Sequence, residues 1–354
     1  RVDSSSFGPE LLALTRQIIQ ASGAIILDWD EKKDSASYTR LDQFMTQPGL
    51  YEEWCERYLP RIEAGKYDYV IFQTIGWLRL TPEQQNKLVG EVLPDVVGKI
   101  RKTGARVILY DKFLPLDHRD EKDQRAQKWV LRYPDGQRLN YLLHIIAARR
   151  AGIDKITFGG DAVLDGWTQE PFRNMRYFYN DAGHPGPLAN YISACCLSYL
   201  LTGVDPVGNP VRKVTVPGWA LNAFRDEPLR DRQAFQDAWK DRLKDSEFQM
   251  TDAEAKALQE LAMKHHRQWN TTLKAAMADE KEFAKVEAEV RNIQADALKP
   301  EAYGMSQQAA EAIRKEFAAA AEPGGLPPAE VAKIRRKCTT LHNVANLSAR
   351  FLPA

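Results

Sequence analysis

The regular alternation of short apolar segments with helical patterns along the first half of the chain is the feature that most constrains its fold. We predict strands at four apolar segments, residues 24–29, 67–75, 105–110 and 155–158. We predict helices before and between these strands, at residues 9–21, 50–64, 81–102 and 138–150, because the apolar residues there follow helical spacing. Strands that alternate with helices of this length favour an α/β fold, with a parallel sheet covered on both faces.

The character of the sequence changes after Pro206. From about Pro228 onward we find no strand pattern, only long charged helical patterns, and one of them opens with a capping box at Thr251. We therefore predict two domains. Residues 1–225 form an α/β domain, and residues 226–354 form an all-α C-terminal domain.

The net charge and the composition limit which kinds of partner and bound group we expect for the protein. The 49 basic and 48 acidic side chains give a net charge of +1, which predicts no strong attraction to nucleic acid or anionic lipid. No stretch approaches about 18 uncharged apolar residues, so we expect no membrane span. The cysteines form no CxxC pair, and the histidines have no second ligand at metal spacing, so we expect no metal site.

The first residue bears on the compartment. Arg1 is not an initiator methionine, so we expect that an N-terminal piece of the protein is missing from the sequence. A targeting segment, if the protein has one, is expected in that piece. The compartment stays open on this reasoning, and export to the periplasm or the outside is compatible with it.

Asp181 and His184 stand three residues apart in a segment rich in glycine and proline, just before an apolar helical pattern that begins at Leu188. The glycines and prolines predict a rigid loop rather than a helix. A carboxylate and an imidazole on one loop can form a general base and the group that orients it. The plain alternative is that Asp181 caps the following helix and His184 is structural.

A base of this kind needs a nucleophile, and serines occur at residues 4–6, just before the first predicted helix. A serine between a first strand and a first helix has an exposed hydroxyl, and its N–H can face a developing oxyanion. Serine triplets also occur in ordinary loops and helix caps.

Together these segments resemble the SGNH/GDSL hydrolase superfamily of esterases and lipases over roughly residues 1–210. Asp181-Ala-Gly-His184, with Tyr191 and Ala194 after it, looks like the last block of that family. The segment that ends at Gln73 resembles the strand of the third block. The resemblance implies a flavodoxin-like three-layer sandwich with a mainly parallel sheet, and ester hydrolysis by a serine without a cofactor.

The resemblance leaves two candidates for the nucleophile. Residues 2–8 fit the family's Gly-Asp-Ser form, which selects Ser4, and also a Gly-Asn-Ser-Phe form, which selects Ser6. In both alignments His184 is the implied base and Asp181 its orienter.

The oxyanion donors depart from the family pattern. The family uses a glycine N–H after its second strand, but residues 35–40 contain no glycine, and the N–H of Ser37 or of Tyr38 is the candidate. In place of the third-block asparagine stands Gln73, with Gly76 close by. Losing one donor costs about 3 kcal/mol, a factor of a hundred or more in rate.

The implied substrate is an ester, and likeness to family members that deacetylate carbohydrates points to an O-acetyl or other O-acyl group on a sugar. The alternative is a catalytically impaired SGNH-like fold that binds a glycan or a protein. A protein partner bound through the helical C-terminal region is a further prediction. Asp161 and Asp165 are expected either to bind a substrate hydroxyl or to form hydrogen bonds within a turn.

Overall fold

The computed structural model of the protein describes most of the chain between Pro9 and Ala297. The described residues are 9–24, 43–46, 49–73, 80, 82–111, 116–118, 129–131, 136–168, 171–172, 177–181, 184–216 and 240–297. The strand predicted at 24–29 lies outside them apart from its first residue. The domain boundary predicted at residue 225 also lies outside them, so the division into two domains stays a prediction.

A parallel sheet organises the α/β part. Its strands are β1 (Tyr69–Gln73), β2 (Arg106–Tyr110) and β5 (Lys155–Thr157), in the order β1-β2-β5. Gln73 pairs with Tyr110, and Tyr110 with Thr157, so the three strands end at the same edge. The strand predictions that fall on described residues are confirmed, and so is the α/β character of this part.

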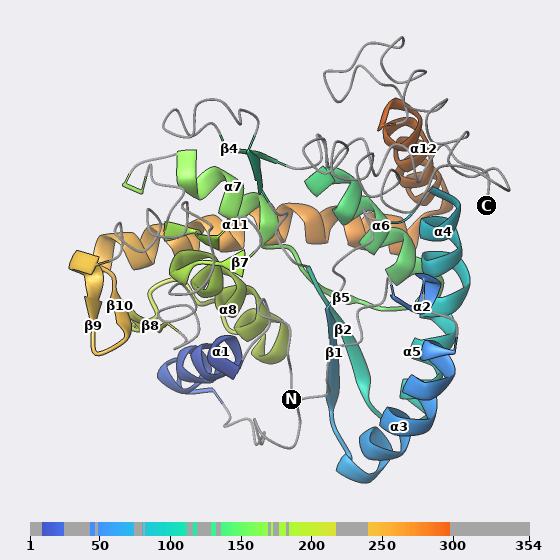
Figure 1. The fold of residues 1–354 in the computed structure, drawn as a ribbon, viewed down its shortest axis with the longest axis horizontal. Coiled ribbons are helices and arrows are strands. Elements are labelled where there is room, and N and C mark those ends of the chain that lie inside the picture. The colour runs from blue at the N-terminus through green and yellow to red at the C-terminus, as the bar shows by residue number, and fades with distance from the viewer. Residues whose placement is uncertain are drawn as a thin grey trace, which may run out of the picture.

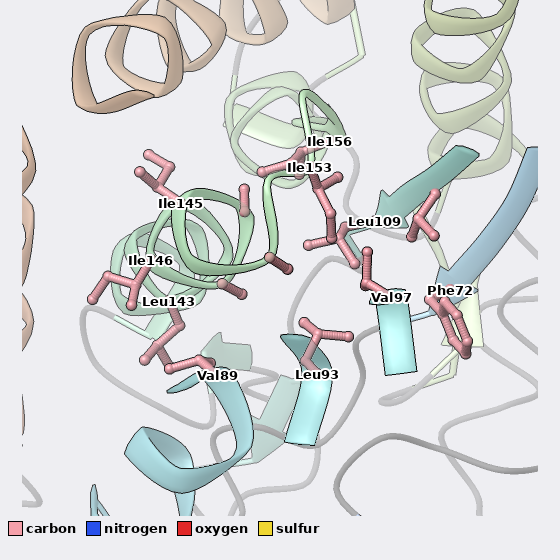
Figure 2. Packing of buried hydrophobic residues seen from close by; sticks show 14 of the residues in the cluster. Phe72, Val89, Leu93, Val97, Leu109, Leu143, Ile145, Ile146, Ile153 and Ile156 are labelled. Carbon is pink, nitrogen blue, oxygen red and sulfur yellow. The ribbon is translucent and has the colours of Figure 1, made fainter. Parts of the chain in front are cut away.

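The helices that precede and connect these strands cover one face of the sheet (Figure 1). They are α3 (Leu50–Gly65), α4 (Pro82–Lys87), the π-helical turn η2 (Leu88–Val92), α5 (Leu93–Lys102) and α6 (Gly136–Ala151). The buried apolar side chains of α3, η2, α5 and α6 meet those of Phe72, Leu109 and Ile156 in a first hydrophobic cluster, which Figure 2 shows from close by. The helix predicted at 81–102 therefore forms, with one π-helical turn inside it.

The opposite face carries a second hydrophobic cluster, built from α1 (Pro9–Ala21), α7 (Gly160–Thr168) and α8 (Pro187–Thr202). Strand β2 joins the two clusters because successive side chains of a strand point to opposite faces. Val107 and Leu109 belong to the first cluster, and Ile108 and Tyr110 to the second. Both faces of this strand are buried, which explains its uninterrupted apolar sequence.

Two long helices follow the α/β part, α11 (Asp252–Ala278) and α12 (Glu280–Ala297). The predicted capping box forms, with Thr251 and Glu254 exchanging side-chain and backbone hydrogen bonds. Helix α11 crosses the molecule and contributes to both hydrophobic clusters, with Leu258 in the second and Trp269 in the first (Figure 1). Its apolar face therefore completes the cores on both sides of the sheet.

Short antiparallel strands add to this framework. Strands β9 (Leu243–Lys244) and β10 (Glu247–Gln249) form a hairpin, and β10 also pairs with β8 (Lys213–Thr215). The prediction of an all-α region after residue 225 is wrong for this hairpin. Its turn residues, Asp245 and Ser246, both have positive φ values, 52° and 65°, although neither is glycine. The turn therefore lacks the glycine that usually marks such hairpins in a sequence.

The remaining elements are small. They are α2 (Gln43–Thr46), the antiparallel pair β3 (Leu116–His118) and β4 (Trp129–Leu131), and the 3-10 turn η4 (Lys240–Arg242). Among the described residues, no helix has the length and apolar character needed to cross a membrane.

Candidate active site

The carboxyl ends of the three parallel strands bring together residues that are far apart in the sequence. Gln73 is the last residue of β1, Asp111 directly follows β2, and Phe158, Gly159 and Gly160 directly follow β5. Gln73 is the predicted oxyanion donor, and its backbone lies at this edge. The position of its side chain is outside what the structure describes.

Helix α8 runs antiparallel to the strands. At the start of β5, the Lys155 ammonium donates to the Leu200 carbonyl, near the C-terminal end of α8. At the other end of the strands, Tyr110 forms a side-chain hydrogen bond with Ser193, in the first half of α8. Gly159 lies against Ile192, so close that a Cβ on the glycine would be 3.4 Å from the Ile192 Cγ2 atom. The N-terminal end of α8 therefore points toward the carboxyl edge of the sheet.

The segment that carries Asp181 and His184 directly precedes this end of α8. It forms two short antiparallel strands, β6 (Tyr179–Asp181) and β7 (His184–Pro185). Asp181 is the pairing partner of His184, and the Gly186 N–H donates to the Phe178 carbonyl over 2.8 Å. The two predicted residues are thus opposite each other in the backbone pairing, while their side chains lie outside the description.

The candidate nucleophiles Ser4 and Ser6, and the candidate oxyanion residues Ser37 and Gly76, lie outside the described residues. What is described is the helix that follows the serines. Helix α1 begins at Pro9 and packs against α8, with its apolar residues in the same cluster as those of α8. In addition, the Asn209 side-chain amide donates to the Ile18 carbonyl over 2.8 Å.

Asp111 is an acidic residue at this edge with several hydrogen bonds, and it is only 3% exposed. Its carboxyl accepts from the Gly160 N–H over 3.2 Å and from the Asn140 side-chain amide. The Gln137 Nε2 atom lies 3.4 and 3.5 Å from the two carboxyl oxygens, and Tyr141 also bonds to the carboxyl. Among the described residues Asp111 has no ion pair. A buried carboxyl whose described partners are all neutral is expected to resist ionisation.

Burial raises the pKa of Asp111 to about 8, and the negative charge of Asp161 acts in the same direction. The hydrogen bonds from Gly160, Tyr141 and Asn140 act against this rise because they favour the carboxylate. A carboxyl with a raised pKa keeps its proton in the native state over a pH range where the unfolded chain has lost it.

The raised pKa predicts how stability depends on pH. From about pH 4 to about pH 8 the native state binds more protons than the unfolded state, so the free energy of unfolding falls as the pH rises. We expect this fall to be steeper in the wild type than in Asp111→Asn, whose amide stays neutral throughout. Urea unfolding of both proteins at about pH 5 and about pH 8 measures the difference. Parallel pH profiles would contradict the prediction.

Asp161 and Asp165 bond to side chains of α11. The Trp269 Nε1–H donates to the Asp161 carboxylate over 2.7 Å, and the His265 Nε2 atom lies 2.7 Å from the Asp165 carboxylate. These contacts differ from both predicted roles, a substrate contact and a turn hydrogen bond. They tie α7, which starts at the carboxyl edge, to α11.

Within the described part of the chain, no three His, Cys, Asp or Glu side chains gather as metal ligands. His144 and His266 are buried, and burial lowers the pKa of each to about 4. Cys195 and Cys196 are buried free thiols within the second hydrophobic cluster, as expected for packing residues. Cys338 lies outside the described residues.

Reasoning from the sequence missed Asp111 and its partners. A signal was present, because Asp111 is a single acidic residue directly after a strand that is apolar on both faces. In parallel sheets such positions face the edge where ligands bind. The partners themselves gave no signal, since Asn140 and Gly160 are 29 and 49 residues away.

Three comparisons with known proteins found one distantly similar solved structure. No protein-family model matches the sequence, and no curated protein matches it. A solved structure of a DUF4886 family protein from Bacteroides uniformis is similar at 17% identity, with a TM-score of 0.36. The match covers 58% of this chain and 64% of that one, less than two thirds of its length.

Proposed function

We propose that the protein is a serine esterase of the SGNH type, acting on an O-acetyl or other O-acyl group of a carbohydrate. In this proposal the hydroxyl of Ser4 or Ser6 attacks the acyl carbon, and His184 takes its proton. Asp181 orients the imidazole and stabilises its charge. The Gln73 amide and the N–H of the nucleophilic serine hold the oxyanion until the alcohol leaves with the proton from His184. Water then releases the acyl group by the same steps, and no cofactor takes part.

One observation supports this proposal more than any other. The hairpin that carries Asp181 and His184 ends at the N-terminus of α8, and this helix end points toward the carboxyl ends of β2 and β5. Parallel α/β sheets bind their ligands beyond the carboxyl ends of the strands. An oriented base is therefore expected where a substrate would bind.

The distribution of helices supports the finer fold that the proposal requires, a flavodoxin-like three-layer sandwich. Helices α1 and α8 share one hydrophobic cluster, and α3, α5 and α6 share the other. In a doubly wound sheet the first and last helices lie together on one face, and a ligand crevice opens where the strand order reverses. On this proposal the strand before α1 lies next to β1, which brings the serines to that crevice.

The test is covalent labelling of the nucleophile. A fluorophosphonate probe reacts with an activated serine, and tandem mass spectrometry of the labelled protein identifies the residue. We expect a single adduct, on Ser4 or on Ser6, and loss of p-nitrophenyl acetate turnover only in the alanine variant of that serine. No adduct on either serine, together with equal rates in the wild type and both variants, would reject the esterase.

The incomplete set of oxyanion donors favours a second function, that of a glycan- or protein-binding module on an SGNH-like fold. No glycine is present in residues 35–40, and Gln73 stands where an asparagine is expected. If the wild type gives no turnover and no adduct but binds an acylated glycan in calorimetry, the binding module is supported. A protein partner of the C-terminal region stays a prediction, which a pull-down with the full chain would test.

A further inference from the structure

Asp111 connects three segments at the carboxyl edge of the sheet. Its carboxyl binds the first turns of α6 through Asn140 and Tyr141, and the start of α7 through the Gly160 N–H. Its own N–H donates to the Thr157 hydroxyl over 2.7 Å, which ties the end of β2 to the end of β5. One buried side chain thus fixes how two strand ends and two helix starts lie relative to one another.

The turn after β5 is tightly confined at this point. A Cβ atom on Gly160 would lie 2.2 Å from the Gln137 Nε2 atom, so a larger residue here would require the buried Gln137 side chain to move. On its other side, Gly159 rests against Ile192 and Cys196 of α8. Movement of the turn away from Asp111 would therefore press on the middle of α8, at Ile192 and Cys196.

A second connection to α8 runs through the neighbouring residue. Tyr110 directly precedes Asp111, is fully buried, and bonds to Ser193. Ser193 and Ile192 both lie within the first two turns of α8, and His184 precedes that helix by three residues. Asp111 is therefore linked to the base-carrying end of α8 by packing on one side and by a hydrogen bond through Tyr110 on the other.

Burial of an acid at this position carries a cost in stability. Asp111 has no ion pair with another described residue, and burying a carboxyl without one costs free energy that hydrogen bonds offset only in part. Local choices that oppose stability are typical of functional sites.

We propose that Asp111 is a positioning residue of the carboxyl edge, whose carboxyl holds the turn at residues 158–160 and, through it, helix α8 and the segment with His184 that directly precedes this helix. The expected loss of hydrolysis when the Asp111 carboxyl is removed rests on the function proposed above. The expected loosening of the backbone at residues 158–160 and in α8 does not rest on it, and it can be measured without any substrate.

The experiment compares Asp111→Ala, Asp111→Asn and Gln294→Ala by hydrogen exchange and by p-nitrophenyl acetate kinetics. Gln294 is a matched control, because it is also buried and its amide donates to the Gln85 side chain over 2.7 Å, between α12 and α4. In Asp111→Ala we expect peptides that cover residues 158–166 and 186–194 to exchange about tenfold faster than in the wild type. In Asp111→Asn we expect near wild-type exchange, because the amide oxygen retains an acceptor for the Gly160 N–H and the Asn140 side chain can turn its carbonyl toward the new NH2 group.

The kinetic part gives the second readout. A shift of about 1 Å in the base is expected to lower kcat about a hundredfold in Asp111→Ala, with KM little changed and kcat restored in Asp111→Asn. Gln294→Ala should leave both peptides and kcat unchanged. Exchange that stays at the wild-type level in Asp111→Ala, or that rises evenly over the whole chain, would overturn the positioning role. Absence of hydrolysis by the wild type would reject the proposed function instead, and the exchange data alone would then decide the role of Asp111.

Discussion

His184→Ala is expected to lower kcat for p-nitrophenyl acetate by about a millionfold relative to the wild type, leaving only residual catalysis by the oxyanion donors. The imidazole is the only group in the proposed mechanism that moves the proton of the serine. Without it the hydroxyl remains a weak nucleophile at neutral pH. Initial rates under identical conditions measure the loss, and thermal unfolding checks that the variant is folded.

Asp181→Asn is expected to lower kcat less than His184→Ala does. An amide cannot hold the imidazole in the required tautomer, and kcat should fall about ten-thousandfold. Asp205→Asn is the matched control, since it makes the same chemical change beyond the other end of α8, where Asp205 pairs with Arg267 on the surface. We expect wild-type activity in the control. Equal activity of Asp181→Asn and Asp205→Asn would contradict the proposed base and orienter.

Trp269→Ala is expected to lower the free energy of unfolding by about 3–5 kcal/mol, the usual cost of truncating a buried large aromatic side chain. The indole is 6% exposed and packs edge-on against Tyr141, with ring centroids 4.7 Å apart. It also stacks beside Phe158 and donates to Asp161. Because these partners all belong to the α/β part, the variant should loosen the attachment of α11 to it. Chemical unfolding followed by circular dichroism measures the change.

Trp269→Phe separates the two contributions of the indole. A phenyl ring keeps most of the packing against Tyr141 and removes only the N–H that Asp161 accepts, so we expect a loss of about 1 kcal/mol. If α11 were instead an independent unit, Trp269→Ala would melt in two transitions, and the one that belongs to the sheet would keep its wild-type midpoint. A single shifted transition is the expected result.

The elements that the sequence predicted well have strong local signals. Helix α1 begins at Pro9 and is followed by Gly23 at φ 70°, and α8 begins at Pro187 and is followed by Gly203 at φ 75°. Proline suits a first helical turn and glycine suits the left-handed residue after a last one. The hairpin of β9 and β10 was missed because strands of two and three residues are too short to show a period.

The residues of the candidate site also differ in whether the local sequence gives a signal for them. Asp181 and His184 were predicted because a few residues of sequence contain both groups and the glycines and prolines around them. Asp111 was not, because its role depends on Asn140 and Gly160, and only folding brings these residues to its carboxyl. The contacts of Asp161 and Asp165 with α11 were missed for the same reason, since about a hundred residues separate the partners.

The position of α11 has a consequence for how the protein is made. Tyr141 and Phe158 leave the ribosome well before Trp269 exists, and at about 5–20 residues per second the delay lasts several seconds. During that interval the nascent chain exposes an aromatic face that only a later part of the same chain will cover. Synthesis therefore passes through a stage in which a holdase chaperone has a defined surface to protect, and a stop codon placed before α11 would make that stage permanent.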